Sequence, residues 1–225
     1  MQTTEKQATE KRVTEKPPPA YVSLGDSLAV GVGASDPQER GYAALYRDAL
    51  AERTRRDVRF VQLGVSGETS ESFINYPQRG SSQLAQAERV LKRYPGATVT
   101  LSLGANDLLR TAGGTDAEHE AAIADYGRNL DYILKRLRGA SDPEPRIAVL
   151  ALYNPAPGSF TDEWVGRLNG EIRAVAEANG ASVAAGDRAF RGHIREYVHY
   201  PDDIHPTDEG YAALARAFER ATGVA

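Results

Sequence analysis

Short apolar runs alternate with segments of helical periodicity along most of the chain. The runs that predict strands are 20–24, 57–63, 97–103, 146–152 and, with a weaker pattern, 181–185. Between them and after the last one, apolar residues recur every three or four positions, as on one face of a helix. These helical segments are marked by Tyr42 to Leu50, Leu84 to Tyr94, Ile123 to Leu137, Val165 to Ala176, and Tyr211 to Phe218.

Five alternations of strand and helix predict an α/β fold with a parallel sheet and helices on both faces, because such crossovers are right-handed. Five strands suit the flavodoxin-like order 2-1-3-4-5. We therefore expect one three-layer α/β/α domain over residues 20–225. Ligands in such sheets bind beyond the carboxyl ends of the strands, where the strand order reverses.

The first nineteen residues have a different composition. Thr-Glu-Lys recurs at a five-residue spacing, at positions 4–6, 9–11 and 14–16, and is followed by Pro17, Pro18 and Pro19. A five-residue step builds no apolar stripe on a helix, so residues 1–19 are predicted to be a disordered polar tether. A stalk of this kind favours an extracellular or cell-surface setting over the cytoplasm.

Composition narrows the classes of function. The 225 residues carry a formal net charge of -4, which argues against nucleic acid as a partner. No apolar run is long enough for a transmembrane helix, so no stable membrane insertion is expected. The chain has no cysteine, which excludes a thiolate nucleophile and a cysteine-ligated metal. Any chemistry must come from serine, histidine, carboxylates or a cofactor, and the sequence leaves the oligomeric state open.

Small polar residues follow the first three predicted strands directly. They are Gly25-Asp26-Ser27-Leu28, Gly64 to Thr69, and Gly104-Ala105-Asn106-Asp107, and a fourth polar segment, Asp202-Asp203-Ile204-His205-Pro206, precedes the last helix. A lone Gly-Asp-Ser is also an ordinary turn. Together, however, the four segments supply a complete set of groups for acyl transfer.

A serine becomes nucleophilic when a base takes its proton and a third group orients that base. Ser27 is the candidate nucleophile and His205 the candidate base. Asp202 precedes His205 by three residues, so within one helical turn its carboxylate would reach the imidazole, while Asp203 would point elsewhere. The backbone N–H groups of Ser27 and Gly67 and the side chain of Asn106 are candidate donors to an oxyanion.

These four segments, in this order, resemble the sequence blocks of the SGNH hydrolases, also called GDSL esterases and lipases. The resemblance covers residues 20–220. It implies Ser27, Asp202 and His205 as the catalytic triad, and Ser27, Gly67 and Asn106 as the oxyanion hole. It also implies a flavodoxin-like sandwich that hydrolyses carboxylic esters without metal or cofactor.

The substrate is less well defined by the sequence. The loops at about 108–117 and 153–162 are short, which favours an open site for short to medium acyl chains. Side chains that either line such a site or pack in the core are Phe73, Tyr76, Leu108 and Tyr153. A carbohydrate O-deacetylase, or a lysophospholipase or thioesterase of the same family, is the enzymatic alternative.

Two alternatives of other classes depend on the same residues. His199, Asp202 and His205 recur every third residue, a spacing that a metal site also uses, but a metal leaves Ser27 and Asn106 without a role. A flavodoxin-like binding module would bind its ligand without turnover. It predicts that a serine-directed fluorophosphonate does not label Ser27.

Overall fold

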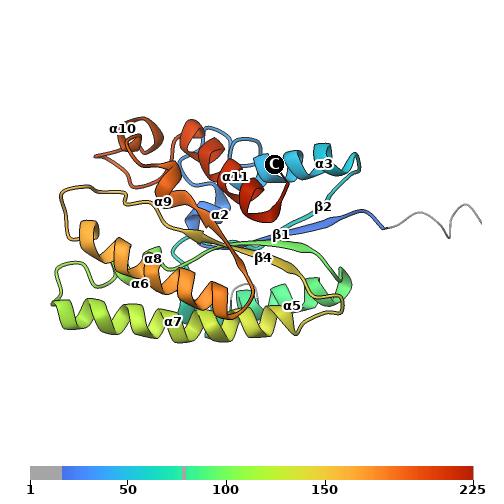
Figure 1. Ribbon diagram of the computed structural model, residues 1–225, viewed down its shortest axis with the longest axis horizontal. Coiled ribbons are helices and arrows are strands. Elements are labelled where there is room, and N and C mark those ends of the chain that lie inside the picture. The colour runs from blue at the N-terminus through green and yellow to red at the C-terminus, as the bar shows by residue number, and fades with distance from the viewer. Residues whose placement is uncertain (1–16, 78–79, 225) are drawn as a thin grey trace, which may run out of the picture.

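The computed structural model describes residues 17–77 and 80–224 and forms a three-layer α/β/α sandwich (Figure 1). Its five parallel strands follow the order β2-β1-β3-β4-β5, as the sequence predicts. The strands are β1 (Ala20–Gly25), β2 (Arg59–Gln62), β3 (Thr98–Ser102), β4 (Arg146–Ala151) and β5 (Ser182–Ala185). Most of the predicted tether lies outside the described residues, so its disorder stays a prediction.

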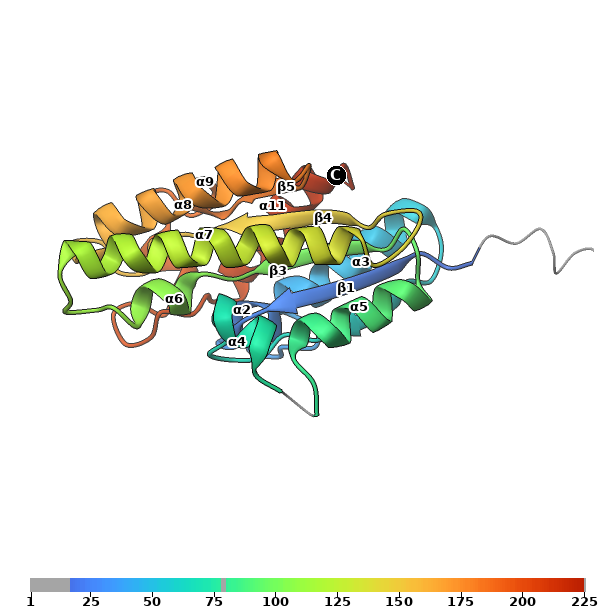
Figure 2. The ribbon, with the colours of Figure 1, turned by 90° about the horizontal axis from the view of Figure 1, so that it is seen from below.

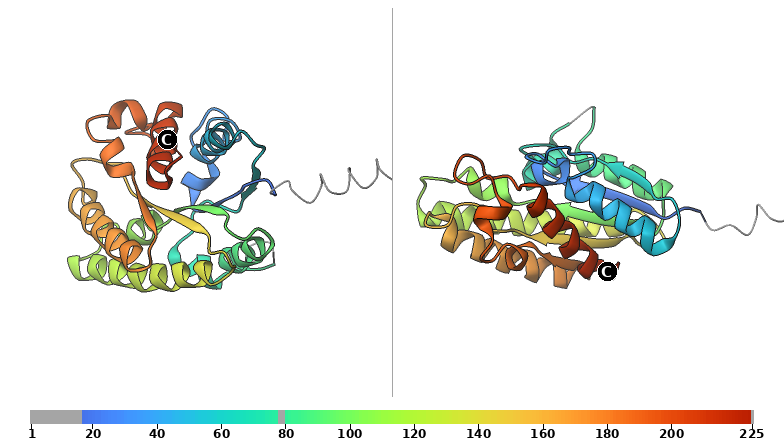
Figure 3. Two further views of the ribbon diagram at one scale, coloured as in Figure 1. Left: turned by 45° about the vertical axis from the view of Figure 1, so that its right-hand side comes forward. Right: turned by 90° about the horizontal axis from the view of Figure 1, so that it is seen from above.

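Five longer helices cover the two faces of the sheet. They are α3 (Tyr42–Thr54), α5 (Gln83–Arg93), α7 (Asp116–Arg138), α8 (Thr161–Ala178) and α11 (Asp208–Thr222). Helices α3 and α11 lie together on one face, and α5, α7 and α8 lie side by side on the other (Figures 1 and 2). The left view of Figure 3, turned by 45° about the vertical axis, shows the two helix layers on opposite sides of the sheet.

The core follows from this layering. Strands β1, β3 and β4 are covered on both faces, and their residues are buried almost without interruption, as parallel sheets require. Leu24, Leu101 and Val149, which are paired in register across these strands, are fully buried. Helix α5 is amphipathic, and its apolar positions Leu84, Ala87 and Leu91 are buried against the sheet.

Short helices gather at the carboxyl ends of the strands, where the functional segments lie. They are α2 (Ser27–Val30), α4 (Ser70–Asn75), α6 (Ala105–Leu109), α9 (Gly186–Ala189) and α10 (Ile194–Tyr197). Figure 2 shows α2, α4 and α6 at the end toward which the strand arrows point. The polar segments that follow β1, β2 and β3 therefore meet at one edge of the sheet, as their positions in the sequence predict.

Candidate active site

Ser27 begins helix α2, immediately beyond the end of β1. Asp26 caps this helix, because its Oδ1 accepts a hydrogen bond of 3.0 Å from the backbone N–H of Leu28. The backbone N–H of Asp26 in turn donates to the carbonyl oxygen of Ser102 on β3 at 3.0 Å. Asp26 is thus held by hydrogen bonds to α2 and to β3. This places the side chain of the next residue, Ser27, at the edge of the sheet.

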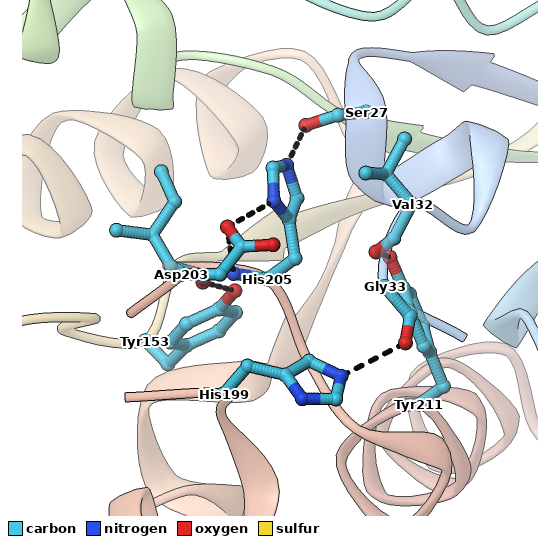
Figure 4. Close-up of polar contacts among 9 residues, drawn as sticks. Ser27, Val32, Gly33, Tyr153, His199, Asp203, His205 and Tyr211 are labelled. Carbon is cyan, nitrogen blue, oxygen red and sulfur yellow. Dashed lines mark hydrogen bonds and ion pairs between the residues drawn. The ribbon is translucent and has the colours of Figure 1, made fainter. Parts of the chain in front are cut away.

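Ser27 and His205 are in direct contact. The Oγ of Ser27 lies 2.9 Å from the Nε2 of His205, although the two residues are 178 positions apart in the sequence (Figure 4). The side chain of His205 is one-fifth exposed, so it reaches the edge of the site without being free in solvent. The predicted pairing of these two residues is present in the fold.

The carboxylate next to His205 is that of Asp203, not Asp202. Asp203 Oδ1 lies 2.7 Å from His205 Nδ1 and also accepts the backbone N–H of His205 at 3.3 Å (Figure 4). In the described part of the chain Asp202 is exposed and has no hydrogen bond to His205. The expectation that Asp203 points elsewhere is therefore wrong, and the geometry does not support Asp202 as the orienting acid.

The physical reason lies in the loop that carries His205. A helical turn would place residue 202 beside residue 205, but residues 199–205 form a closed loop instead. The backbone N–H of Asp203 donates to the carbonyl oxygen of His199 at 3.0 Å, and that of His199 donates to the carbonyl oxygen of His205 at 3.1 Å. Asp203 is held beside the imidazole by this closure, and Asp202 lies at the outer part of the loop.

Further contacts fix this loop against the rest of the site. Tyr153 donates its hydroxyl to the carbonyl oxygen of Ile204 at 2.7 Å. His199 Nε2 lies 2.9 Å from the carbonyl oxygen of Gly33, in the loop that follows α2 (Figure 4). His205 uses both ring nitrogens and His199 uses Nε2 within the protein, and the described residues contain no group of three histidine or carboxylate side chains placed to hold a metal ion.

Electrostatics at Asp203 agree with an ionised carboxylate beside the imidazole. Partial burial acts to raise the pKa of Asp203, but the hydrogen bonds and the charge of His205 outweigh it and hold the pKa below its ordinary value. A carboxylate at Nδ1 selects the imidazole tautomer that carries its proton there. That tautomer leaves Nε2 free to accept the proton of Ser27.

Gly67 lies in a tight turn that faces Ser27. The backbone N–H of Glu68 donates to the carbonyl oxygen of Val65 at 3.1 Å, which closes a β-turn with Gly67 at its third position. Gly67 has a φ of +80°, which favours glycine. Within the described chain its backbone N–H has no acceptor, and Ser27, Gly67 and Asn106 line the same cavity.

Asn106 lies on α6, directly after β3. Its side-chain amide carries two N–H donors, one of which donates to the carbonyl oxygen of Glu68 at 2.9 Å. The bond ties Asn106 to the turn that contains Gly67. The second N–H remains for a ligand in the cavity, so the predicted oxyanion donors are brought to one place.

Two polar contacts hold these loops together. The fully buried Gln83 accepts from the backbone N–H of Gly25 at 2.6 Å and donates to Glu68 Oε2 at 2.8 Å. Asp107 accepts from the Oγ of Ser70, at the start of α4, at 2.5 Å. Gln83 resembles any polar residue in the first turn of a helix, so only the tertiary contacts identify it.

The predicted substrate-binding residues divide into two pairs. Leu108 and Tyr153 line the cavity next to Ser27. Phe73 is fully buried in the core and Tyr76 is 55% exposed, and neither lines this cavity. Phe73 therefore takes the second of its two expected places, in the core, whereas Tyr76 takes neither, because the chain leaves α4 at that residue. Val165 and Leu168 of α8 and Ile204 line the cavity but were not predicted to do so.

Comparison with known proteins agrees with this geometry. Residues 23–213 match the model of the GDSL-like Lipase/Acylhydrolase family, which is most of the chain. The chain is also 28% identical over 213 residues to the spore germination lipase LipC of Bacillus licheniformis, covering 89% of this chain and 95% of that protein.

Solved structures show the same fold. The lipase Lip_vut3 from a goat rumen metagenome superposes with a TM-score of 0.76 at 24% identity, over 90% of this chain and 97% of that one. The acetylxylan esterase Axe2 from Geobacillus stearothermophilus superposes with a TM-score of 0.70 at 18% identity, over 91% and 94% of the two chains.

The chain therefore belongs to the GDSL-like lipase and acylhydrolase family, the SGNH hydrolases that its sequence blocks resemble. It is a carboxylic ester hydrolase, and membership of this family implies a small-molecule substrate. Among the described residues no helix has the length and apolar character that a membrane span needs.

Proposed function

We propose that the protein is a serine esterase that hydrolyses esters of short to medium acyl chains through an acyl-enzyme. The observation that carries this proposal is the continuous chain of contacts from Ser27 Oγ to His205 Nε2 and from His205 Nδ1 to Asp203. An aligned serine, imidazole and carboxylate form the arrangement that activates a serine for attack on a carbonyl.

In the first half of the reaction, Ser27 Oγ forms a bond to the ester carbonyl carbon while His205 Nε2 takes the hydroxyl proton. The carbonyl oxygen becomes an oxyanion that accepts hydrogen bonds from the backbone N–H groups of Ser27 and Gly67 and from Asn106. The bond to the alcohol oxygen then breaks, and His205 donates its proton to the departing alcohol.

In the second half, a water molecule attacks the carbonyl carbon of the acyl-enzyme and His205 takes a proton from it. The bond to Ser27 Oγ then breaks, and the proton returns from His205 to the serine as the carboxylic acid leaves. Asp203 keeps its charge throughout, because its role is to orient the imidazole and to stabilise the imidazolium that forms twice in each cycle.

Removal of an acetyl group from a carbohydrate is the principal alternative within the family. The likeness to an acetylxylan esterase extends to the fold alone at 18% identity. Much of the wall beside Ser27 is apolar, which favours simple esters over acetylated sugars.

The direct test is turnover of p-nitrophenyl acetate and butyrate by the purified protein, with Ser27→Ala assayed in parallel. We expect release of p-nitrophenol by the wild-type protein and a loss of at least three orders of magnitude in kcat for the variant. Acetylated xylo-oligosaccharides in the same assay series distinguish a deacetylase. Equal turnover by the wild-type protein and Ser27→Ala would exclude Ser27 as the nucleophile.

A further inference from the structure

The cavity beside Ser27 extends into an apolar compartment between two helices. It has a volume of about 190 Å³. Its apolar walls come from Leu108 and Leu109 of α6, from Val165 and Leu168 of α8, and from Pro155 in the segment after β4. Leu108 and Leu168 are 2% and 1% exposed, so these walls belong to the packed interior rather than to a surface depression.

The polar groups of the cavity are concentrated at the reaction centre. Asp26, Ser27, Ser66, Gly67, Asn106 and His205 supply most of them, and the hydroxyl of Tyr153 donates to the carbonyl oxygen of Ile204. The hydroxyl of Thr161, the polar side chain that α8 adds to the lining, is already used, because it donates to Asn154 Oδ1 at 2.6 Å. Beyond Asn106, the described lining that α6 and α8 contribute is therefore apolar apart from Thr161, which favours a hydrocarbon chain over a hydroxylated acyl group or a sugar.

The size of the whole cavity, reaction centre included, sets the length of the acyl group that it holds. An apolar protein cavity of about 150 Å³ takes up benzene, a molecule of six carbons. A cavity of about 190 Å³ is larger by the equivalent of one or two methylene groups. An acetyl group leaves most of this volume empty, whereas a chain of twelve or more carbons does not fit within it.

We propose, building on the serine esterase function proposed above, that the compartment between α6 and α8 binds the acyl chain and selects unbranched acyl groups of about six to eight carbons. The carbonyl carbon lies at Ser27 and the chain extends past Leu108 toward Val165 and Leu168. The alcohol occupies the exposed side of the site and is selected less strictly.

Each methylene that enters the compartment is expected to raise kcat/KM up to about fourfold, because it leaves water for an apolar site. For p-nitrophenyl esters from acetate to palmitate, kcat/KM of the wild-type enzyme should rise at least tenfold from acetate to a maximum at hexanoate or octanoate. It should then fall for laurate and longer chains.

Three variants separate this binding role from general effects on the fold. Val165→Phe places a ring in the compartment and should move the maximum to butyrate or shorter. Leu168→Ala enlarges the compartment and should move the maximum toward decanoate. The control is Ala174→Phe, which adds the same ring at an exposed position of α8 and should leave the profile unchanged.

The outcomes are distinguishable. A profile that decreases from acetate onward in the wild-type enzyme, or a maximum that neither Val165→Phe nor Leu168→Ala moves, overturns the assignment of the compartment but leaves the esterase function standing. Absence of Ser27-dependent turnover at every chain length overturns the esterase function and this inference with it. A maximum at six to eight carbons that both variants move in the expected directions supports the assignment of the compartment as the acyl-binding site.

Discussion

Asp26 is the most unusual ionisable residue near the reaction centre. It is 1% exposed, and its Oδ2 has no hydrogen-bond partner among the described residues, while Oδ1 accepts from Leu28 and Ser102. Burial raises its pKa from 3.8 to about 7, and those hydrogen bonds only partly oppose the increase. Asp26 therefore caps α2, the helix that begins with Ser27, and we assign it this structural role rather than that of a base.

This raised pKa makes stability depend on pH. Between pH 4 and 7 the folded protein keeps a proton on Asp26 that the unfolded chain releases, so the free energy of unfolding falls as pH rises. From pH 5 to pH 8 the contribution is about 2 to 3 kcal/mol. Urea denaturation at pH 5 and pH 8 measures the free energy of unfolding. In Asp26→Asn this part of its decrease with pH should be absent. An unchanged pH dependence would show that Asp26 is ionised in the folded state.

The two neighbouring aspartates of the His205 loop provide a matched pair of variants. Asp203→Asn keeps the shape of the side chain but removes the charge at His205 Nδ1, and kcat should fall by about two to four orders of magnitude with little change in KM. Asp202→Asn should change kcat by less than about threefold. The reverse result would identify Asp202 as the orienting acid, as the sequence motif implies.

At the scale of elements, the strands and the longer helices were predictable because their periodicity reports burial directly. Strand β1 was expected at 20–24 and runs from Ala20 to Gly25, and the buried positions of α7 recur as its pattern indicates. The short helices α4 and α6 were not predicted, because a helix of five or six residues has too few positions to show a period.

The site was predictable to a similar extent. Ser27 and His205 follow from residue type and position, because strand ends meet at one edge of the sheet. Asp203 does not follow, because its position depends on hydrogen bonds within the loop. Val165 and Leu168 continue the apolar stripe of α8 toward Ile172, so the sequence cannot distinguish residues that face a cavity from those that face the core.

The junction of β1 and β3 tolerates no side chain at Gly25. A Cβ there would lie 1.8 Å from the carbonyl oxygen of Ser102, and φ is +122°. Gly67 also has a positive φ, but a Cβ there would meet no atom within 4 Å. Gly25→Ala should therefore fail to give folded protein.

The comparison variant Gly67→Ala should fold with a loss of about 1 to 2 kcal/mol, which lowers Tm by roughly 2 to 8 °C. Thermal unfolding followed by circular dichroism measures both variants. Similar melting temperatures for the two would contradict the steric argument, because backbone strain alone would then account for both.

At the scale of the whole molecule, one sheet and one continuous core predict cooperative unfolding. The buried hydrophobic residues of both faces form a single cluster that includes strands β1, β3 and β4 and the longer helices. Trp164, the single tryptophan of the sequence, is 4% exposed at the start of α8 and reports on that helix and its contact with His119 of α7. Its fluorescence and the far-UV circular dichroism should give the same midpoint in urea. Separate midpoints would mean that α8 leaves the sheet before the rest unfolds.

Activation of Ser27 by His205 is tested most directly by covalent labelling with a fluorophosphonate, followed by mass spectrometry of the labelled peptide. Such a reagent reacts with a serine that a base has activated. We expect one adduct, on Ser27, with labelling at least a hundredfold slower in His205→Ala and absent in Ser27→Ala. Folded wild-type protein that remains unlabelled, or that is labelled at another serine, would contradict the assignment of Ser27 and His205 as the catalytic pair.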